Sequence, residues 1–319
     1  MRTPPFISLG CALLLGFVIS SLHTAAAEKR VLPDDEARKI ASAVPRKATV
    51  EPAVPRRLLV FTLANGYYHQ SIPDGAKAVE LMGQRTGAFK ATVSDDPAVF
   101  EPESLRQFDG ICLVNALGEF FLPDNLEQRP AAEQETIRAR DRRLKQNLVE
   151  YVRSGKGLAS IHGGCYAFHQ WSGFADLLGA AFDSHPWNGH ERIAVKVDDP
   201  GHPVVSAFGG HGFEIIDEGY QFKDPYSRRQ LRVLLSMDLS RMDLQKTNLR
   251  PDHDFGLAWV KRFGEGRIFY CALGHNPEEY WNPALLQHFL DGIQFALGDL
   301  KADTTPLPAE AQANLRPRF

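Results

Sequence analysis

Residues 158–171, LASIHGGCYAFHQW, are typical of a buried strand that runs directly into a tight turn. The apolar run ends at His162, Gly163 and Gly164 follow, and Cys165 comes next. In open α/β sheets, ligands bind beyond the carboxyl ends of the strands. The stretch therefore raises the question whether His162 or Cys165 takes part in chemistry or is only packed there.

Expected strands alternate with expected helices up to this stretch. Strand-like apolar runs occupy residues 57–64, 89–96, 108–116 and 156–164. An amphipathic helix is expected between the first two runs, and a helix over 146–155 precedes the last one. Because strand–helix–strand units place their strands in parallel, we predict an α/β fold with a mainly parallel sheet flanked by helices.

The second half of the chain has a different pattern. Further strands are expected at residues 191–199, 213–222, 231–238 and 256–274, the last interrupted by the hairpin turn FGEGR. Residues 282–300 predict a closing helix. The polar segment 117–143 is expected to be a lid or a solvated excursion.

The two ends of the chain are expected to lie outside the main domain, residues 57–300. Residues 1–27 are typical of a signal peptide, since CALLLGFVIS is followed by small residues at 25–27. This apolar run is shorter than the roughly 20 residues of a membrane span. We therefore expect an exported protein, periplasmic or extracellular. Residues 28–56 predict an extended lead-in with at most one short helix, and residues 301–319 a loose tail.

Composition narrows the class of partner. The formal net charge is −3 at pH 7, so nothing indicates nucleic acid binding. No second apolar run indicates membrane contact after signal cleavage. The cysteines beyond residue 27 are Cys112, Cys165 and Cys271, which allow at most one disulfide. Cys112 and Cys271 lie in apolar runs and are expected to be buried.

Three histidines each follow an expected buried strand: His69, His162 and His275. Their side chains are therefore expected to reach one crevice at the same edge of the sheet. Neutral imidazoles with a carboxylate suit Zn²⁺ or a similar divalent metal. Acid–base chemistry without a metal is the alternative. Glu278 lies three residues after His275, near enough to orient its ring by a hydrogen bond.

The stretch IIDEGYQF supplies a carboxylate for the same crevice. Adjacent residues of a strand face opposite ways, so Glu218 and Tyr220 share a face and Asp217 takes the other. We favour the pair Glu218 and Tyr220. Asn115 also falls at the end of an expected strand.

Seven motifs in this order resemble the ThuA-like family of trehalose-utilisation proteins, over residues 57–300. They are HxSI from His69, GKGLxxIH ending at His162, HPW from His185, HP at His202, DExY from Asp217, GRIFYCALGH ending at His275, and Trp281. The family's fold is similar to that of class I glutamine amidotransferases, which is flavodoxin-like. The resemblance therefore implies this α/β architecture, with added C-terminal strands.

The resemblance also implies a small-molecule sugar substrate. It suggests a carbohydrate-processing enzyme acting on a disaccharide, including 3-keto forms, or on another glycoside. In that case His162, His275 and Glu218 would be catalytic. His69, Asn115, Trp187, Tyr220 and Trp281 would form the substrate site. The metal ligands would be His69, His162 and His275, with a divalent ion such as Zn²⁺ as cofactor, or with none.

Comparison with amidotransferases bears on the opening question. Their nucleophilic cysteine lies in a GxCxG turn, and SIHGG is similar to this turn with His162 in the cysteine position. HNPE, from His275, resembles their HPE motif with one residue inserted. The resemblance therefore implies a retained scaffold with a replaced nucleophile. Two alternatives stay open: a non-catalytic carbohydrate-binding protein, and a hydrolase or amidotransferase-like enzyme that uses Cys165.

Overall fold

The computed structural model describes residues 29–308. The predicted signal peptide, residues 1–27, and the tail beyond residue 308 lie outside this range. The lead-in contains the one short helix expected, α1 (Asp34–Ala43). It then packs on the closing helix α6 (Pro283–Ala296), where Thr49 N donates to Gln294 Oε1 at 2.9 Å.

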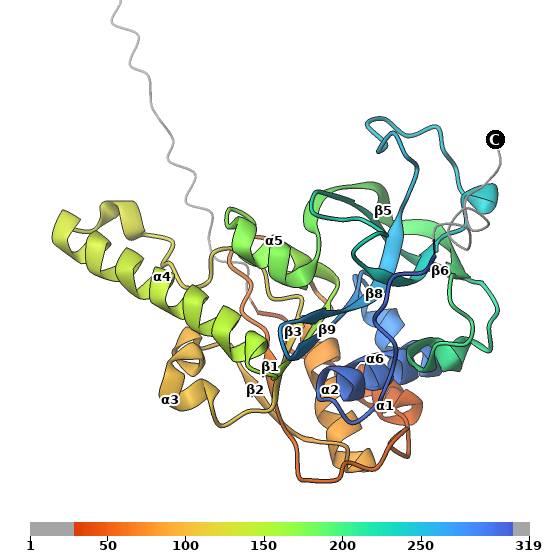
Figure 1. Ribbon diagram of the computed structural model, residues 1–319, viewed down its shortest axis with the longest axis horizontal. Coiled ribbons are helices and arrows are strands. Elements are labelled where there is room, and N and C mark those ends of the chain that lie inside the picture. Colours follow the sequence, from red (N-terminus) through yellow and green to blue (C-terminus); the bar gives the residue numbers. More distant parts are fainter. Residues whose placement is uncertain (1–28, 309–319) are drawn as a thin grey trace, which may run out of the picture.

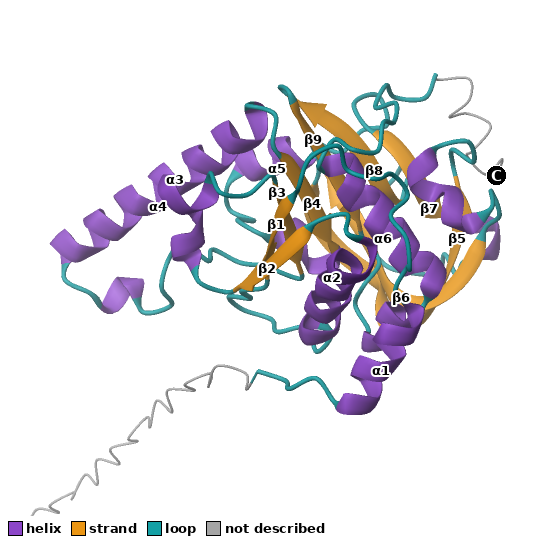
Figure 2. Cartoon of the chain, turned by 90° about the horizontal axis from the view of Figure 1, so that it is seen from below, coloured by secondary structure: helices purple, strands orange, loops and turns teal. Residues whose placement is uncertain are grey.

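The strands of the described range form one nine-stranded sheet in the order β2-β1-β3-β4-β9-β8-β7-β5-β6 (Figure 2). Five neighbouring strands are parallel: β2 (Lys90–Ser94), β1 (Arg57–Phe61), β3 (Gly110–Val114), β4 (Gly157–Ile161) and β9 (Gly266–Cys271). The others pair antiparallel: β8 (Gly256–Phe263), β7 (Arg232–Met237), β5 (Ala181–Val197) and β6 (Phe213–Lys223).

This arrangement corrects the expectation of a mainly parallel sheet. Four of the strand pairings are parallel and four are antiparallel. The predicted hairpin between β8 and β9 is confirmed, and it begins the antiparallel half because so short a connection can only reverse the chain. The added strands are therefore four of the nine strands and are continuous with the parallel ones.

Helices cover both faces of the parallel half (Figures 1 and 2). Helix α2 (Ile72–Thr86) and α6 lie on one face, with α1 against α2. Helix α4 (Ala131–Arg153) and α5 (Ser172–Leu178) lie on the other, near α3 (Pro102–Leu105). Because both faces are covered, every residue of β3 and β4 is buried.

Local sequence sets the ends of the two helices nearest the parallel strands. The Asn282 side chain accepts hydrogen bonds from Ala284 N and Leu285 N, and Pro283 occupies the first helical position of α6. Helix α2 ends at Gly87, which has the left-handed φ of 68° common after helices.

Short 3-10 helices complete the fold: η1 (Pro97–Phe100), η2 (Leu126–Gln128), η3 (His162–Tyr166), η4 (Pro203–Phe208), η5 (Leu239–Arg241) and η6 (Pro277–Trp281).

The segment 117–143 is neither a lid nor a plain solvated loop. Residues 131–143 are the first half of α4, which projects from the body of the molecule (Figure 1). Phe120 and Phe121 at its start are buried, and the Phe120 ring packs on Phe168 with 4.2 Å between ring centroids. The start of the segment therefore belongs to the core.

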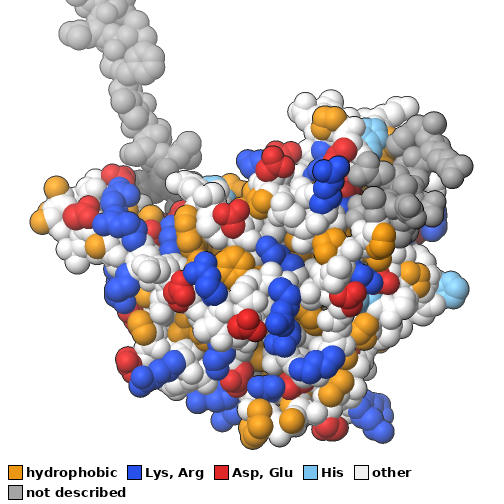
Figure 3. Space-filling view, in the orientation of Figure 1, with side chains coloured by type: hydrophobic (Ala, Val, Ile, Leu, Met, Phe, Trp, Pro, Cys, Tyr) orange, Lys and Arg blue, Asp and Glu red, His pale blue; other side chains and the backbone are white. Residues whose placement is uncertain are grey.

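The surface fits the small net charge. Basic and acidic side chains are interspersed on the face drawn in Figure 3. Among the helices of residues 29–308, none has the length and apolarity needed to cross a membrane. The three cysteines in this range are free and buried, as expected for Cys112 and Cys271.

Candidate metal centre

The turn after β4 places His162 at the carboxyl edge of the sheet. His162 has a φ of 45°, a left-handed conformation that a β-carbon disfavours. The next two positions must be glycine, because a Cβ at Gly163 would lie 2.8 Å from His69 Cε1. A Cβ at Gly164 would lie 2.4 Å from Ser160 Oγ. The HGG sequence is thus required for the histidine to enter the site.

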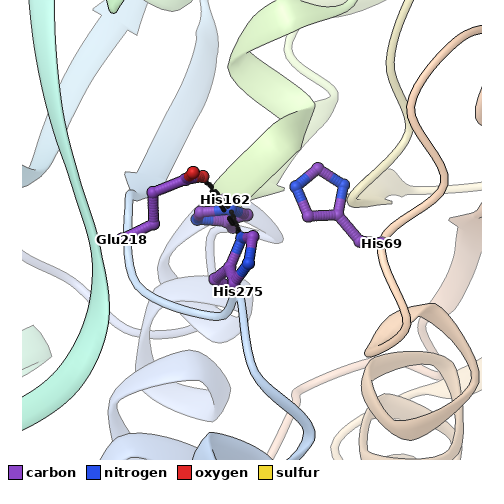
Figure 4. A group of neighbouring side chains, drawn as sticks. All are labelled: His69, His162, Glu218 and His275. Carbon is purple, nitrogen blue, oxygen red and sulfur yellow. Dashed lines mark hydrogen bonds and ion pairs between the residues drawn. The ribbon is translucent and has the colours of Figure 1, made fainter. Parts of the chain in front are cut away.

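Four side chains converge at this edge: His69, His162, Glu218 and His275 (Figure 4). Each offers one ligand atom, and these atoms all lie within 4.8 Å of one another. The three histidines follow β1, β4 and β9 of the parallel half. Glu218 comes from β6 of the antiparallel half. The structure therefore brings together the three predicted metal ligands and the predicted carboxylate.

The separations fit one metal ion. His162 Nε2 lies 3.1 Å from His275 Nδ1. Glu218 Oε2 lies 3.4 Å from His162 Nε2 and 3.2 Å from His275 Nδ1. A tetrahedral ion with bonds of about 2.1 Å separates its ligand atoms by about 3.4 Å. The three imidazoles and one carboxylate thus suit Zn²⁺ or a similar divalent ion.

Hydrogen bonds select the tautomer of His162. Its Nδ1 lies 2.6 Å from Ala272 O, and because a carbonyl only accepts, Nδ1 must carry the proton. The lone pair of Nε2 is then directed at the cluster, where the Tyr220 hydroxyl donates to it at 2.7 Å. A backbone carbonyl that orients a histidine in this way is typical of metal sites.

The charges of His69 and Glu218 suit a cation, whereas Glu218 favours the protonated form of His275, which would have to lose its proton to bind one. Burial, with the nearby imidazoles, lowers the pKa of His69 to about 2, so this ring is neutral. Burial alone would raise the pKa of Glu218, but the imidazoles of His162 and His275 beside it lower this pKa below its usual range. Burial likewise opposes protonation of His275, yet Glu218 raises its pKa overall. His69 Nδ1 is buried and has no hydrogen-bond partner in the described range.

Asn115 connects the loops that carry the histidines. Its Oδ1 accepts from Gly163 N at 2.9 Å, while Nδ2 donates to Ser71 Oγ at 3.1 Å and to Gly274 O at 3.2 Å. Ser71 Oγ in turn donates to His275 O at 2.8 Å. Because Asn115 is fully buried and its amide is engaged by the protein, the structure indicates a positioning residue rather than the predicted substrate contact.

Asp217 holds the turn before His275, a role that the sequence did not reveal. Its Oδ1 accepts from Glu218 N at 2.6 Å and from His275 N at 3.3 Å, and its Oδ2 from Gly274 N at 3.1 Å. Glu278, predicted to orient His275, is exposed. No hydrogen bond or ion pair within residues 29–308 joins Glu278 to His275. Glu218 is the carboxylate that does so.

The two tryptophans predicted for the substrate site do not line the cluster. Trp187 is buried and paired with Gly219, so its ring lies on the sheet face opposite that of Glu218 and Tyr220. Its Nε1 donates to Asp243 O at 3.0 Å. The Trp281 ring is covered by Lys39 of α1, with Nζ 4.0 Å from the ring centroid.

Cys165 does not have the environment of a nucleophile. It lies in η3 and is 3% exposed. Burial raises the pKa of its thiol to about 12, so the reactive thiolate is suppressed near neutral pH. The position that faces the crevice is occupied by His162, as the turn sequence predicted.

Two exposed side chains beside the cluster were not among the predicted site residues. His185 Nδ1 lies 3.2 Å from Glu218 Oε1, and its side chain is 48% exposed. Tyr67 contacts the rings of His69 and His275 and is 62% exposed. The only sequence signal for these two residues was their position near predicted site residues. Tyr67 lies two residues before His69, and His185 is the first residue of the HPW motif.

Comparisons with known proteins agree with this architecture. A family model described as ThuA, trehalose utilisation, matches residues 57–296. A ThuA-like protein from Bacteroides uniformis is 19% identical, with a TM-score of 0.58 over 76% of this chain and 92% of that one. A cytoplasmic protein from Salmonella typhimurium is 16% identical, with a TM-score of 0.51 over 76% of this chain and 98% of that one. No curated protein sequence matches.

Proposed function

The chain belongs to the ThuA family of trehalose utilisation proteins, and on that premise we propose a metal-dependent carbohydrate-processing enzyme. The observation that carries the proposal is the convergence of three imidazoles and one carboxylate within 4.8 Å. The substrate class is a disaccharide or another glycoside, including 3-keto forms. The family description supports a carbohydrate substrate, and the cluster of three imidazoles and one carboxylate supports metal-dependent chemistry.

His69, His162, His275 and Glu218 hold the ion in this proposal. A divalent ion such as Zn²⁺, when bound by these residues, would supply Lewis-acid chemistry toward a sugar oxygen or a water molecule. The chain itself contributes the orientation of His162 through Ala272 O. The Tyr220 hydroxyl lies 2.7 Å from His162 Nε2. Because this nitrogen has one lone pair, which the ion would take, the hydroxyl proton would then be available to an oxygen atom of the bound sugar or water. Burial raises the pKa of Tyr220 well above its usual value, so this hydroxyl remains a donor.

The proposal includes export. Residues 1–27 combine a short apolar run with small residues at the expected cleavage position. An exported enzyme of this class would meet its sugar outside the cytoplasm. N-terminal sequencing of the protein recovered from a periplasmic fraction tests this part, and an uncleaved N-terminus would contradict it.

Metal content and turnover test the central proposal. We expect near-stoichiometric divalent metal in the purified protein by mass spectrometry, and its loss in His162→Ala. Glu278→Gln is the matched control, because Glu278 is exposed and does not contact the cluster. Product release from trehalose, other disaccharides and their 3-keto derivatives should follow the metal content.

Two results would overturn the proposal. If the parent protein contains no metal, or if His162→Ala has the same metal content as the parent, the proposed metal centre is wrong. Metal and sugar binding without turnover of any of these substrates would favour a non-catalytic binding protein on the same scaffold.

A further inference from the structure

Tyr67 is the most exposed aromatic side chain beside the candidate metal centre. It is 62% exposed, and no other Phe, Tyr or Trp of residues 29–308 is comparably exposed. A single exposed apolar side chain is ordinary on a protein surface. What distinguishes Tyr67 is its place against the rings of His69 and His275.

The ring contacts two of the proposed metal ligands. It meets His69 edge to face, with 4.7 Å between centroids and planes at 82°. It lies parallel to His275, with 6.5 Å between centroids and 16° between planes. Because His69 and His275 are themselves largely buried, Tyr67 forms a solvent-facing wall of the centre.

The loop that carries Tyr67 is held in place through Asn65, two residues before the ring. Asn65 N donates to Leu117 O at 2.9 Å, and Asn65 Nδ2 donates to Leu122 O at 3.2 Å. Gly66 has a φ of 124°, which only glycine adopts without strain. A Cβ at Gly118 would lie 1.9 Å from Asn65 O, so the two loops are in close contact. The ring is thus preorganised rather than loosely displayed.

The same loop lines a cleft. Asn65, Gly66 and Tyr68, the neighbours of Tyr67 in the chain, line a cavity of about 680 Å³ together with Phe120, Leu122 and Asp124. Tyr67 and the four residues of the cluster are not among its lining residues. This volume is within the range of small-molecule sites. Its lining combines aromatic surface with amide and carboxylate groups, the combination that suits a polyhydroxylated ring.

We propose that Tyr67 is the stacking platform for a pyranose ring whose oxygen atoms reach the metal centre. The inference rests on the proposed function and adds the contact that holds the sugar. Pyranose rings present C–H bonds on one face and hydroxyl groups at the edge. A rigid phenol ring offers the complementary apolar face with a polar tip.

Calorimetric titration of trehalose into the zinc-loaded protein tests the inference. We expect Tyr67→Ala to weaken trehalose binding by about tenfold or more, because the stacking face is lost. Tyr67→Phe keeps the face and should stay within about threefold of the parent. Ile216→Ala is the matched control, since Ile216 is exposed on β6 two residues before Glu218. Zinc affinity should be unchanged in all three variants.

Each contrary result has a distinct meaning. Unchanged trehalose binding in Tyr67→Ala would overturn the platform and leave the proposed function standing. Equal losses in Tyr67→Phe and Tyr67→Ala would assign the effect to the hydroxyl group and also overturn it. Loss of zinc in Tyr67→Ala would make Tyr67 a support for the ligands instead. A zinc-loaded parent that binds no trehalose overturns the platform, and a parent that takes up no zinc overturns the proposed function as well.

Discussion

The strained backbone of His162 is held by contacts on three sides. Its Nδ1 donates to Ala272 O, and its carbonyl accepts from Tyr270 OH at 3.1 Å. The next residue, Gly163, is held by Asn115. Left-handed non-glycine residues persist when their surroundings determine the conformation, and they are concentrated at functional sites. The turn is therefore built to direct this imidazole.

Gly189 provides the first residue-scale prediction. It lies on β5, and a Cβ there would lie 2.5 Å from His275 Cδ2. Gly189→Ala should displace this ring and weaken zinc binding by about tenfold or more, measured by competition with a chromophoric chelator. Gly201→Ala is the matched control, because no atom lies within 4 Å of its added Cβ. Equal zinc affinities in the two variants would contradict the assignment of His275 as a ligand.

Asp217 provides the second residue-scale prediction. In Asp217→Asn, the remaining side-chain oxygen can still accept a hydrogen bond. The new NH2 group would face Gly274 N, and because both groups are donors, this hydrogen bond would be lost. The turn that carries His275 should shift, and zinc affinity should fall by about tenfold, as for other residues that orient metal ligands. Glu278→Gln is the control, because this exposed carboxylate does not contact the cluster. If Asp217→Asn binds zinc as tightly as the parent protein, the turn keeps its conformation without this carboxylate.

At this scale the sequence predicted the side chains that converge in the cluster better than the residues that support them. His69, His162 and His275 each follow a buried strand, so their convergence depends only on the topology of a parallel sheet. Glu218 was found from strand alternation, and the same rule explains why Trp187, paired with Gly219, faces away. Asn115 and Asp217 act on loops that are distant in sequence. No local pattern reveals such contacts.

At the scale of elements, strand directions and one helix were not predictable. Local patterns show that a strand exists but not which neighbour it joins, so the antiparallel half was underestimated. The first half of α4 was missed because it is polar on most sides and lacks an apolar stripe. It is held partly by ion pairs, including Arg140 and Arg143 with Glu101.

The contact between α6 and the lead-in gives a pH-dependent prediction. Asp291 of α6 accepts a hydrogen bond from Thr49, and burial raises its pKa from 3.8 to about 6. A raised pKa in the folded state favours the protonated acid, so its contribution to stability falls as pH rises from about 4 to 6. The loss is on the order of 3 kcal/mol.

Asp291→Asn lacks this titration. The stability of the variant relative to the parent should therefore increase between about pH 4 and pH 6 and remain constant above that range. Urea unfolding at several pH values measures the difference in the free energy of unfolding. A difference that does not change with pH would show that this carboxyl group titrates alike in the folded and unfolded chain.

The whole molecule is divided by its sheet, and the proposed metal joins the halves. Three ligands belong to the parallel half, whereas Glu218 is on β6 at the far edge of the sheet order. An unfolded chain cannot hold four groups spread from residue 69 to residue 275 around one ion. Metal binding should therefore stabilise only the folded state.

This linkage gives a prediction for thermal unfolding. Zinc at about 100 times its dissociation constant should add about 2.7 kcal/mol, or roughly 5–10 °C in Tm for a chain of this size. A chelator should reverse the increase. Glu218→Gln should lose most of it, because the anionic ligand from the antiparallel half is gone, whereas the exposed Glu278→Gln should keep it. Equal zinc-dependent shifts in the two variants would place the ion elsewhere, and the halves of the sheet would then be joined by packing alone.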